Sequence, residues 1–117
     1  MGYLNTWCEQ YGVDRNEITY ACEDLGDHTL GVSRYRRVSG ERFADVRIHE
    51  CLRDYTLTRR AVSWHEFCHA ERWLKTGTTD GHGSEWLKRM WREPFLAIYD
   101  IFVASIVFTI VRKRDRF

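Results

Sequence analysis

The side chains best suited to chemistry are the two histidines and the glutamate of the run His65-Glu66-Phe67-Cys68-His69. On a helix, His65 and His69 lie on one face about one turn apart, so both imidazoles can hold one metal ion. A third histidine, His82, follows after twelve residues and has a glycine on either side. Zinc in a hydrolytic site requires three protein ligands and one open position, so we predict that these three histidines bind Zn²⁺. Glu66 can then take a proton from a zinc-bound water.

The pattern HExxH followed by Gly81-His82-Gly83-Ser84-Glu85-Trp86 resembles the SprT-like zinc metallopeptidases, which include the Spartan-type proteases of DNA–protein crosslink repair. The resemblance covers about residues 17–92. It implies a peptidase in which Glu66 activates water for attack on a peptide carbonyl. It also implies a protein or peptide substrate, including proteins associated with DNA. The crosslink-repair members bind DNA through basic and zinc-containing elements outside the catalytic domain, and this chain has no cysteine ribbon or long basic extension.

Two acids compete with His82 for the place of the third ligand. Asp80 ends the run Gly77-Thr78-Thr79-Asp80, which resembles part of the loop in deuterolysin-type proteases, where an aspartate is the third zinc ligand. The rest of that pattern does not fit, because it expects an extra residue and a tyrosine before the closing glycine. Glu85, at the start of the following helix, is a more remote candidate. We therefore favour His82.

The motif requires a helix, and residues 57–75 have the composition to form one. The segment contains neither Gly nor Pro, and Gly77 is a suitable C-terminal stop. Its apolar residues occupy much of the helix circumference, so we predict a central helix that is buried on several sides. Shorter helices are predicted at residues 4–11 and 84–92, the second of them directly after the loop that carries His82.

Three strands are predicted before the central helix, at residues 17–22, 29–38 and 42–50. The third strand alternates most clearly, with Ala44, Val46 and Ile48 on one face and Asp45, Arg47 and His49 on the other. We interpret His49 as a solvent-facing strand residue rather than a catalytic one. The predicted fold class is α+β: a small three-stranded antiparallel sheet packed against the zinc-binding helix, with further helices and an apolar C-terminal segment.

Residues 95–111 are the most apolar part of the chain, and a basic cluster follows them. We therefore predict a SprT-like metallopeptidase domain at residues 1–94 and an apolar C-terminal segment with a basic tail at residues 95–117. As a helix, residues 95–111 would be roughly 26 Å long, slightly short of a ~30 Å hydrocarbon core. The cost of placing Asp100 in a bilayer nearly cancels the gain from the apolar residues. Packing on the domain or docking on a partner subunit are the alternatives to a membrane anchor.

Composition narrows the remaining function classes. The chain has 117 residues, 44% of them hydrophobic and 15% aromatic, which is enough for one core. Its net charge is only +1, so no basic domain indicates a nucleic-acid partner, although arginines outnumber lysines fifteen to three. The four cysteines form no CxxC pair, and the N-terminal residues do not resemble a signal peptide. Both observations favour a cytoplasmic protein.

The sequence thus predicts a zinc-dependent metallopeptidase with Glu66 as its catalytic residue. The alternative is a non-catalytic subunit that keeps zinc as a structural staple and docks on a partner through its apolar C-terminal segment. The glutamate favours the enzyme, because a purely structural zinc site does not need a carboxylate at that position.

Overall fold

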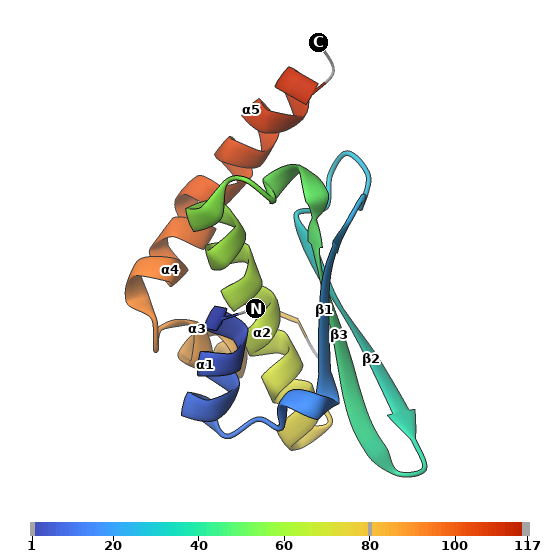
Figure 1. Cartoon of the computed structure of the whole chain (residues 1–117). Coiled ribbons are helices and arrows are strands. Elements are labelled where there is room, and N and C mark those ends of the chain that lie inside the picture. The colour runs from blue at the N-terminus through green and yellow to red at the C-terminus, as the bar shows by residue number, and fades with distance from the viewer. Residues whose placement is uncertain (1, 80, 116–117) are drawn as a thin grey trace.

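The computed structural model describes residues 2–79 and 81–115 and confirms the α+β class. A three-stranded sheet lies on one side of a long helix, and the remaining helices lie around the other sides of that helix (Figure 1). The helices are α1 (Gly2–Tyr11), α2 (Thr56–Thr76), α3 (Ser84–Met90), α4 (Pro94–Tyr99) and α5 (Ser105–Asp115). The strands are β1 (Ile18–Glu23), β2 (Gly31–Val38) and β3 (Glu41–His49). Each helix and strand predicted from the sequence is therefore present.

The sheet is mixed, whereas the sequence predicted an antiparallel one. Its strand order is β1-β3-β2, with β2 antiparallel to β3 but β1 parallel to β3. Residues 24–30 connect β1 to β2, which are the two outer strands of the sheet. The later strand β3 lies between them and pairs with both. The antiparallel prediction is wrong for β1, because the turn at Gly26 and Asp27 does not join neighbouring strands.

His49 is fully buried at the end of β3, and the prediction that it faces solvent is wrong. Its Nδ1 atom accepts a hydrogen bond from the Cys51 N–H at 3.1 Å, and its Nε2 atom lies 2.8 Å from the Gly26 carbonyl oxygen. The His49 backbone N–H donates to the Leu30 carbonyl at 2.8 Å. The imidazole therefore anchors the loop between β1 and β2. The alternation of β3 fails at its last residue because that loop covers it.

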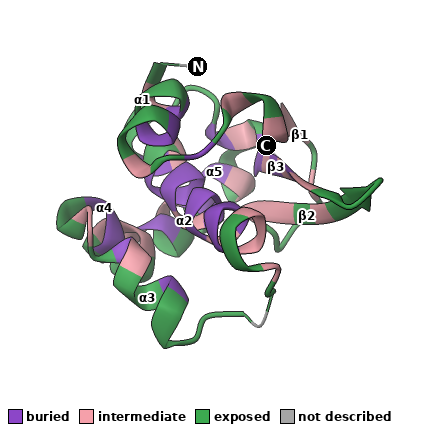
Figure 2. Ribbon diagram, turned by 90° about the horizontal axis from the view of Figure 1, so that it is seen from below, coloured by how far each residue is buried: buried purple, intermediate pink, exposed green. Residues whose placement is uncertain are grey.

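Helix α2 is the centre of the hydrophobic core, as its composition predicts. It packs against β2 and β3 on one side, and Figure 2 shows buried positions along its length. Helix α1 contributes Trp7, whose ring centroid lies 5.0 Å from that of Trp64 and 5.7 Å from that of Phe67. Cys68 is a buried free thiol. Polar side chains on such a helix lose their hydration, so each of them needs a partner.

The apolar C-terminal segment forms a continuous helix, Pro94–Asp115, which consists of α4, a π-helical turn at Asp100–Ala104, and α5. Its inner face packs on α2, and Leu96, Ala97 and Ala104 belong to the same core cluster as the residues of α1, α2 and the sheet. Within residues 2–79 and 81–115, this is the one helix that is long and apolar enough to cross a membrane by length and composition.

The outer face of the C-terminal helix carries large apolar side chains that residues 2–79 and 81–115 leave exposed. They recur at intervals of three and four residues and are 48% to 67% exposed: Phe95, Ile98, Phe102, Ile106 and Ile110. We call this set the outer apolar stripe. Contiguous exposed apolar surface of this kind is typical of a docking face.

Candidate metal centre

The three histidines predicted from the sequence converge on one point. His65 and His69 are presented by α2, and His82 comes from the loop between α2 and α3. The Nε2 atom of His65 lies 3.2 Å from that of His69 and 3.1 Å from that of His82, and one ring nitrogen from each residue lies within 4.8 Å of the others. Zinc bonded tetrahedrally at about 2.0–2.1 Å would hold its nitrogen ligands roughly 3.3 Å apart. The three imidazoles are therefore close enough to hold a metal ion.

Backbone conformation explains how His82 reaches the helix. Helix α2 ends at Gly77, which adopts a left-handed conformation with φ +73° and donates its N–H to the Trp73 carbonyl at 2.8 Å. Gly81, directly before His82, is also left-handed with φ +74°. A residue with a β-carbon rarely adopts this conformation, so glycine is needed at both positions. Gly83 has φ −72° and open space around it, so it does not require glycine in the same way.

The structure describes one of the two acids that compete with His82. Asp80 lies outside the described residues. Glu85 is on α3 with its side chain 53% exposed, and it pairs with Lys88 and Arg89 at 3.6 Å each. Within residues 2–79 and 81–115, Glu85 does not belong to the group of side chains that are close enough together to hold a metal ion.

Trp86 forms a wall behind the three imidazoles. Its ring stacks on His69 with an interplanar angle of 17°, and it meets His65 and His82 edge-on at centroid distances of 4.8 Å and 4.7 Å. The indole N–H also donates to the His65 carbonyl at 3.3 Å. Trp86 thus packs against the motif helix.

Glu66 lies beside the histidines in a buried position. The Ser33 hydroxyl on β2 donates to its Oε1 atom at 2.8 Å and to its backbone oxygen at 3.0 Å. The Oε2 atom of Glu66 lies 3.9 Å from Nε2 of His65. Burial raises the pKa of the Glu66 carboxyl, against the lowering effects of the nearby His65 charge and the Ser33 hydrogen bond. The carboxyl therefore binds a proton more readily than a glutamate in water does.

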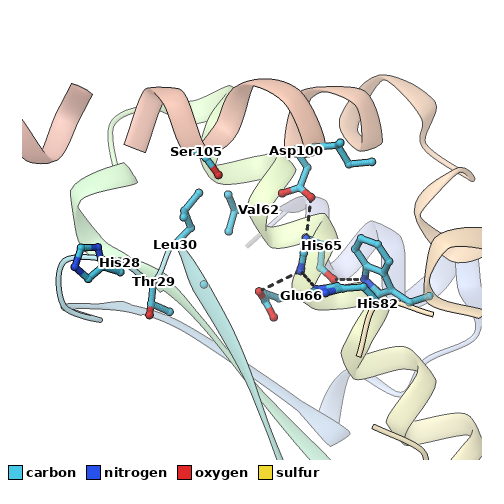
Figure 3. Close-up of a pocket in the computed structure, with 12 residues that line it drawn as sticks. His28, Thr29, Leu30, Val62, His65, Glu66, His82, Asp100 and Ser105 are labelled. Carbon is cyan, nitrogen blue, oxygen red and sulfur yellow. Dashed lines mark hydrogen bonds and ion pairs between the residues drawn. The ribbon is translucent and has the colours of Figure 1, made fainter. Parts of the chain in front are cut away.

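The second ring nitrogen of His65 contacts an acid on the C-terminal helix. Nδ1 of His65 lies 2.8 Å from Oδ2 of Asp100 (Figure 3). Burial lowers the pKa of His65, but the hydrogen bond to Asp100 and the charges of Glu66 and Asp100 outweigh it, so the net shift is upward. Burial and the charges of the other two imidazoles lower the pKa of His69 to about 3, and burial lowers that of His82. His69 and His82 are therefore neutral near pH 7, which is the form that binds metal.

Two cavities open onto the histidines. The first, of about 410 Å³, extends toward the C-terminal helix and the loop before β2 (Figure 3). Its apolar lining includes Leu30, Val62 and Ile101. The second, of about 300 Å³, extends along β2 toward His69. Four residues line both cavities: Gly31, His65, Glu66 and His82. The centre is accessible from both directions.

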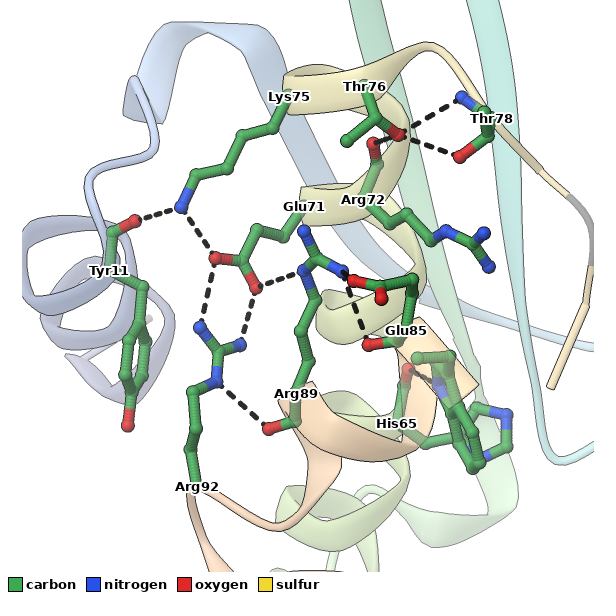
Figure 4. A network of polar contacts seen from close by, with 11 residues as sticks. Tyr11, His65, Glu71, Arg72, Lys75, Thr76, Thr78, Glu85, Arg89 and Arg92 are labelled. Atoms are coloured by element: carbon green, nitrogen blue, oxygen red, sulfur yellow. Dashed lines mark hydrogen bonds and ion pairs between the residues drawn. The ribbon is translucent and has the colours of Figure 1, made fainter. Parts of the chain in front are cut away.

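A network of charges fixes α3 and the residues directly after it against α2 (Figure 4). Glu71 on α2 is buried and pairs in a bidentate manner with Arg92, with one of the two contacts at 3.0 Å. Lys75 lies 2.7 Å and Arg89 3.5 Å from the same carboxylate. The bonds to Arg92 and Lys75 lower the pKa of Glu71 although burial opposes this. Because α3 also carries Trp86, this network holds one wall of the candidate metal centre in place.

Sequence reasoning missed two residues that contact the centre. In the sequence, Asp100 was interpreted only as a residue that disfavours membrane insertion. A lone acid in an apolar helix was itself a signal, because a buried acid needs a partner. Ser33 gave no comparable signal, since it lies among arginines in β2 and its contact with Glu66 depends on how the sheet packs on α2.

Comparison of the sequence with protein-family models and curated proteins, and of the structure with solved structures, gave no match.

Proposed function

We propose that this chain is a zinc-dependent metallopeptidase of the SprT-like kind, with His65, His69 and His82 as zinc ligands and Glu66 as general base. The main support for this proposal is the position of the Glu66 carboxylate. It is buried, held by Ser33, and 3.9 Å from the His65 nitrogen that faces the other imidazoles. Hydrolysis requires a base within reach of the attacking water, whereas a structural metal site does not.

Access to the centre also supports an enzyme. Structural zinc sites are closed by four protein ligands, while catalytic sites keep a position open. Here three imidazoles converge, His82 is exposed, and a cavity approaches from each of two directions. The arrangement therefore leaves room for a water molecule and a substrate beside the Glu66 carboxylate.

The chemistry divides between the ion and the side chains. Bound zinc would act as a Lewis acid and lower the pKa of water to near neutrality. Glu66 accepts the proton of the attacking water and returns it to the leaving amine. Its raised pKa, caused by burial, helps it to hold that proton between the two steps. Ser33 keeps the carboxylate oriented throughout.

The proposed substrate is an extended segment of a protein or peptide. The second cavity follows β2, which is an edge strand because the sheet order is β1-β3-β2. Edge strands bind extended peptides through main-chain hydrogen bonds. DNA-associated proteins are one such substrate class, but the net charge of +1 gives no reason to expect that DNA is required. Within this proposal the protein acts in the cytoplasm with its C-terminal helix packed on α2.

A zinc-stabilised interaction subunit without catalysis is the second candidate. The outer apolar stripe favours it, because the five large side chains of this stripe offer a docking face on a helix that already packs on α2. Carbonate extraction of membranes tests whether a lipid bilayer is the partner of that face. If the extraction releases the protein completely, its C-terminal helix is not inserted in the membrane.

The test of the proposed function is reversible removal of the metal. Purified protein with one zinc per chain is expected to cleave a reduced, unfolded protein substrate, with or without single-stranded DNA. A chelator should stop cleavage, and added zinc should restore it. A folded chain that holds one zinc yet leaves every unfolded substrate intact would contradict the peptidase. If the chelator also unfolds that chain, the structural subunit becomes the better explanation.

Gly31 at the start of β2 is expected to be essential for the position of Glu66. A β-carbon there would lie 2.9 Å from Cγ1 of Val62 and 3.1 Å from Cγ of Glu66. Gly31→Ala should push the carboxylate from its place, and a misplacement of about 1 Å can cost roughly 10²-fold in rate. The measurement is kcat/KM at full zinc loading. Gly83→Ala is the matched control, because nothing lies within 4 Å of the added carbon. Equal activity in both variants would show that close packing at Gly31 does not position Glu66.

A further inference from the structure

Asp100 occupies a distinctive place in the C-terminal helix. It is the only charged residue in the apolar run 95–111 and begins the π-helical turn Asp100–Ala104. Its side chain is only 11% exposed and points toward α2 (Figure 3). π-Helical turns within α-helices are rare and frequently occur at functional sites. The turn brings Asp100 to the candidate metal centre.

The contact of Asp100 with His65 determines which nitrogen of the imidazole faces the other two histidines. Nδ1 of His65 lies 2.8 Å from the carboxylate, which can only accept a hydrogen bond when ionised, so Nδ1 carries the proton. In the neutral ring the other nitrogen, Nε2, then has a free lone pair. That lone pair points to the place where the Nε2 atoms of His69 and His82 converge.

The helix that carries Asp100 is fixed on both sides of the π-helical turn. Before it, the Tyr99 hydroxyl lies 2.6 Å from the Thr58 hydroxyl of α2. Beyond it, Arg112 pairs with Asp27 of the loop between β1 and β2 at 2.7 Å. Between these points Ala104 is buried against the core. The carboxylate therefore reaches His65 from a held position, as a group that orients a metal ligand must.

We propose that Asp100 is a positioning residue of the metal centre, which holds His65 with Nδ1 protonated and Nε2 directed to the ion. The C-terminal helix then forms part of the centre. This inference rests on the metal-binding part of the proposed function and not on catalysis. Carboxylates that orient metal-binding histidines in this way typically contribute about 10- to 100-fold to metal affinity.

The test measures metal binding rather than hydrolysis. Zinc affinity is determined by competition with a chromophoric chelator, and the ligand field is followed through the visible absorption of the Co²⁺-loaded protein. Asp100→Ala should weaken zinc binding by about 10- to 100-fold and change the Co²⁺ spectrum. Asp100→Asn keeps an acceptor oxygen but not the charge, so its loss should be smaller. Asp115→Asn is the control, because Asp115 is an exposed acid on the same helix and should bind zinc like the parent.

A merely structural Asp100 would give a different pattern: lower stability of the metal-free protein with unchanged zinc affinity of the folded state. That result overturns the proposal. A second measurement does not depend on whether the variants fold. In ¹⁵N NMR spectra of the zinc-loaded parent, His65 should show a protonated Nδ1 and a metal-bound Nε2, and the reverse assignment also overturns it. A chain whose zinc affinity depends on Asp100 but which cleaves nothing would refute the peptidase and leave this inference standing.

Discussion

Glu66→Gln is expected to abolish most peptide hydrolysis while zinc remains bound. Glutamine has the same shape, and its amide oxygen can still accept the hydrogen bond that Ser33 donates to Oε1 at 2.8 Å. It cannot take up the proton of the attacking water. General acid–base catalysis typically contributes about 10²- to 10⁴-fold, so kcat/KM should fall by that factor. Zinc content, measured on the same samples, should stay at one per chain.

The matched control for this variant is Glu85→Gln. Glu85 is close to His82 in the sequence, but its side chain is 53% exposed and pairs with Lys88 and Arg89 at 3.6 Å each. Its substitution should leave activity and zinc content unchanged. A Glu66→Gln protein that cleaves as well as the parent would falsify the assignment of Glu66 as the base. The Glu66 variant should also be at least as stable as the parent, because a neutral amide is easier to bury than a carboxylate.

Periodic patterns in the sequence predicted most of the elements that surround the centre. Helical geometry alone places His65 and His69 on one face, and the composition of residues 57–75 predicts a buried helix. The loop histidine was recognisable because Gly81 allows a left-handed turn directly before it. Such inferences succeed because each depends on residues that are close together in the chain.

The failures all concern contacts between distant segments. The direction of β1 relative to β3 depends on how residues 24–30 cross the sheet, and no local pattern encodes that path. The burial of His49 depends on the same loop. The contact of Asp100 with His65 joins residues 35 positions apart and requires a π-helical turn. Alternation and helical periodicity carry no information about such pairings.

The contact between Asp100 and His65 also bears on whether the apolar C-terminal helix can span a membrane. In the observed arrangement its inner face packs on α2, and its only acid within residues 95–111 pairs with His65. To cross a bilayer, the helix would have to leave α2 and move that acid into hydrocarbon. The arrangement in which Asp100 pairs with His65 is therefore incompatible with a membrane-spanning position of the same helix. The outer apolar stripe can contact a membrane surface or a partner without disturbing the centre.

His82→Ala is expected to remove zinc from the purified protein. The side chain is exposed on a loop, so its loss leaves no cavity in the core, and the metal-free variant should unfold at the temperature of the metal-free parent. The loss of affinity should exceed the roughly 10- to 100-fold typical of residues that only orient a ligand. A ligand present at 100 times its dissociation constant stabilises a protein by about 2.7 kcal/mol. The parent should therefore melt at a higher temperature with zinc than without it, and this difference should disappear in the variant.

Asp80→Asn makes this experiment decisive, because Asp80 is two residues from His82 and is the acid that a deuterolysin-type site would use. With His82 as the ligand, the Asp80 variant should bind zinc and gain stability from it as the parent does. If the Asp80 variant loses zinc and the His82 variant keeps it, the third ligand is the aspartate. Loss in both variants would mean that the loop conformation, rather than one side chain, controls binding. The convergence of the His82 Nε2 atom on that of His65 at 3.1 Å favours the histidine.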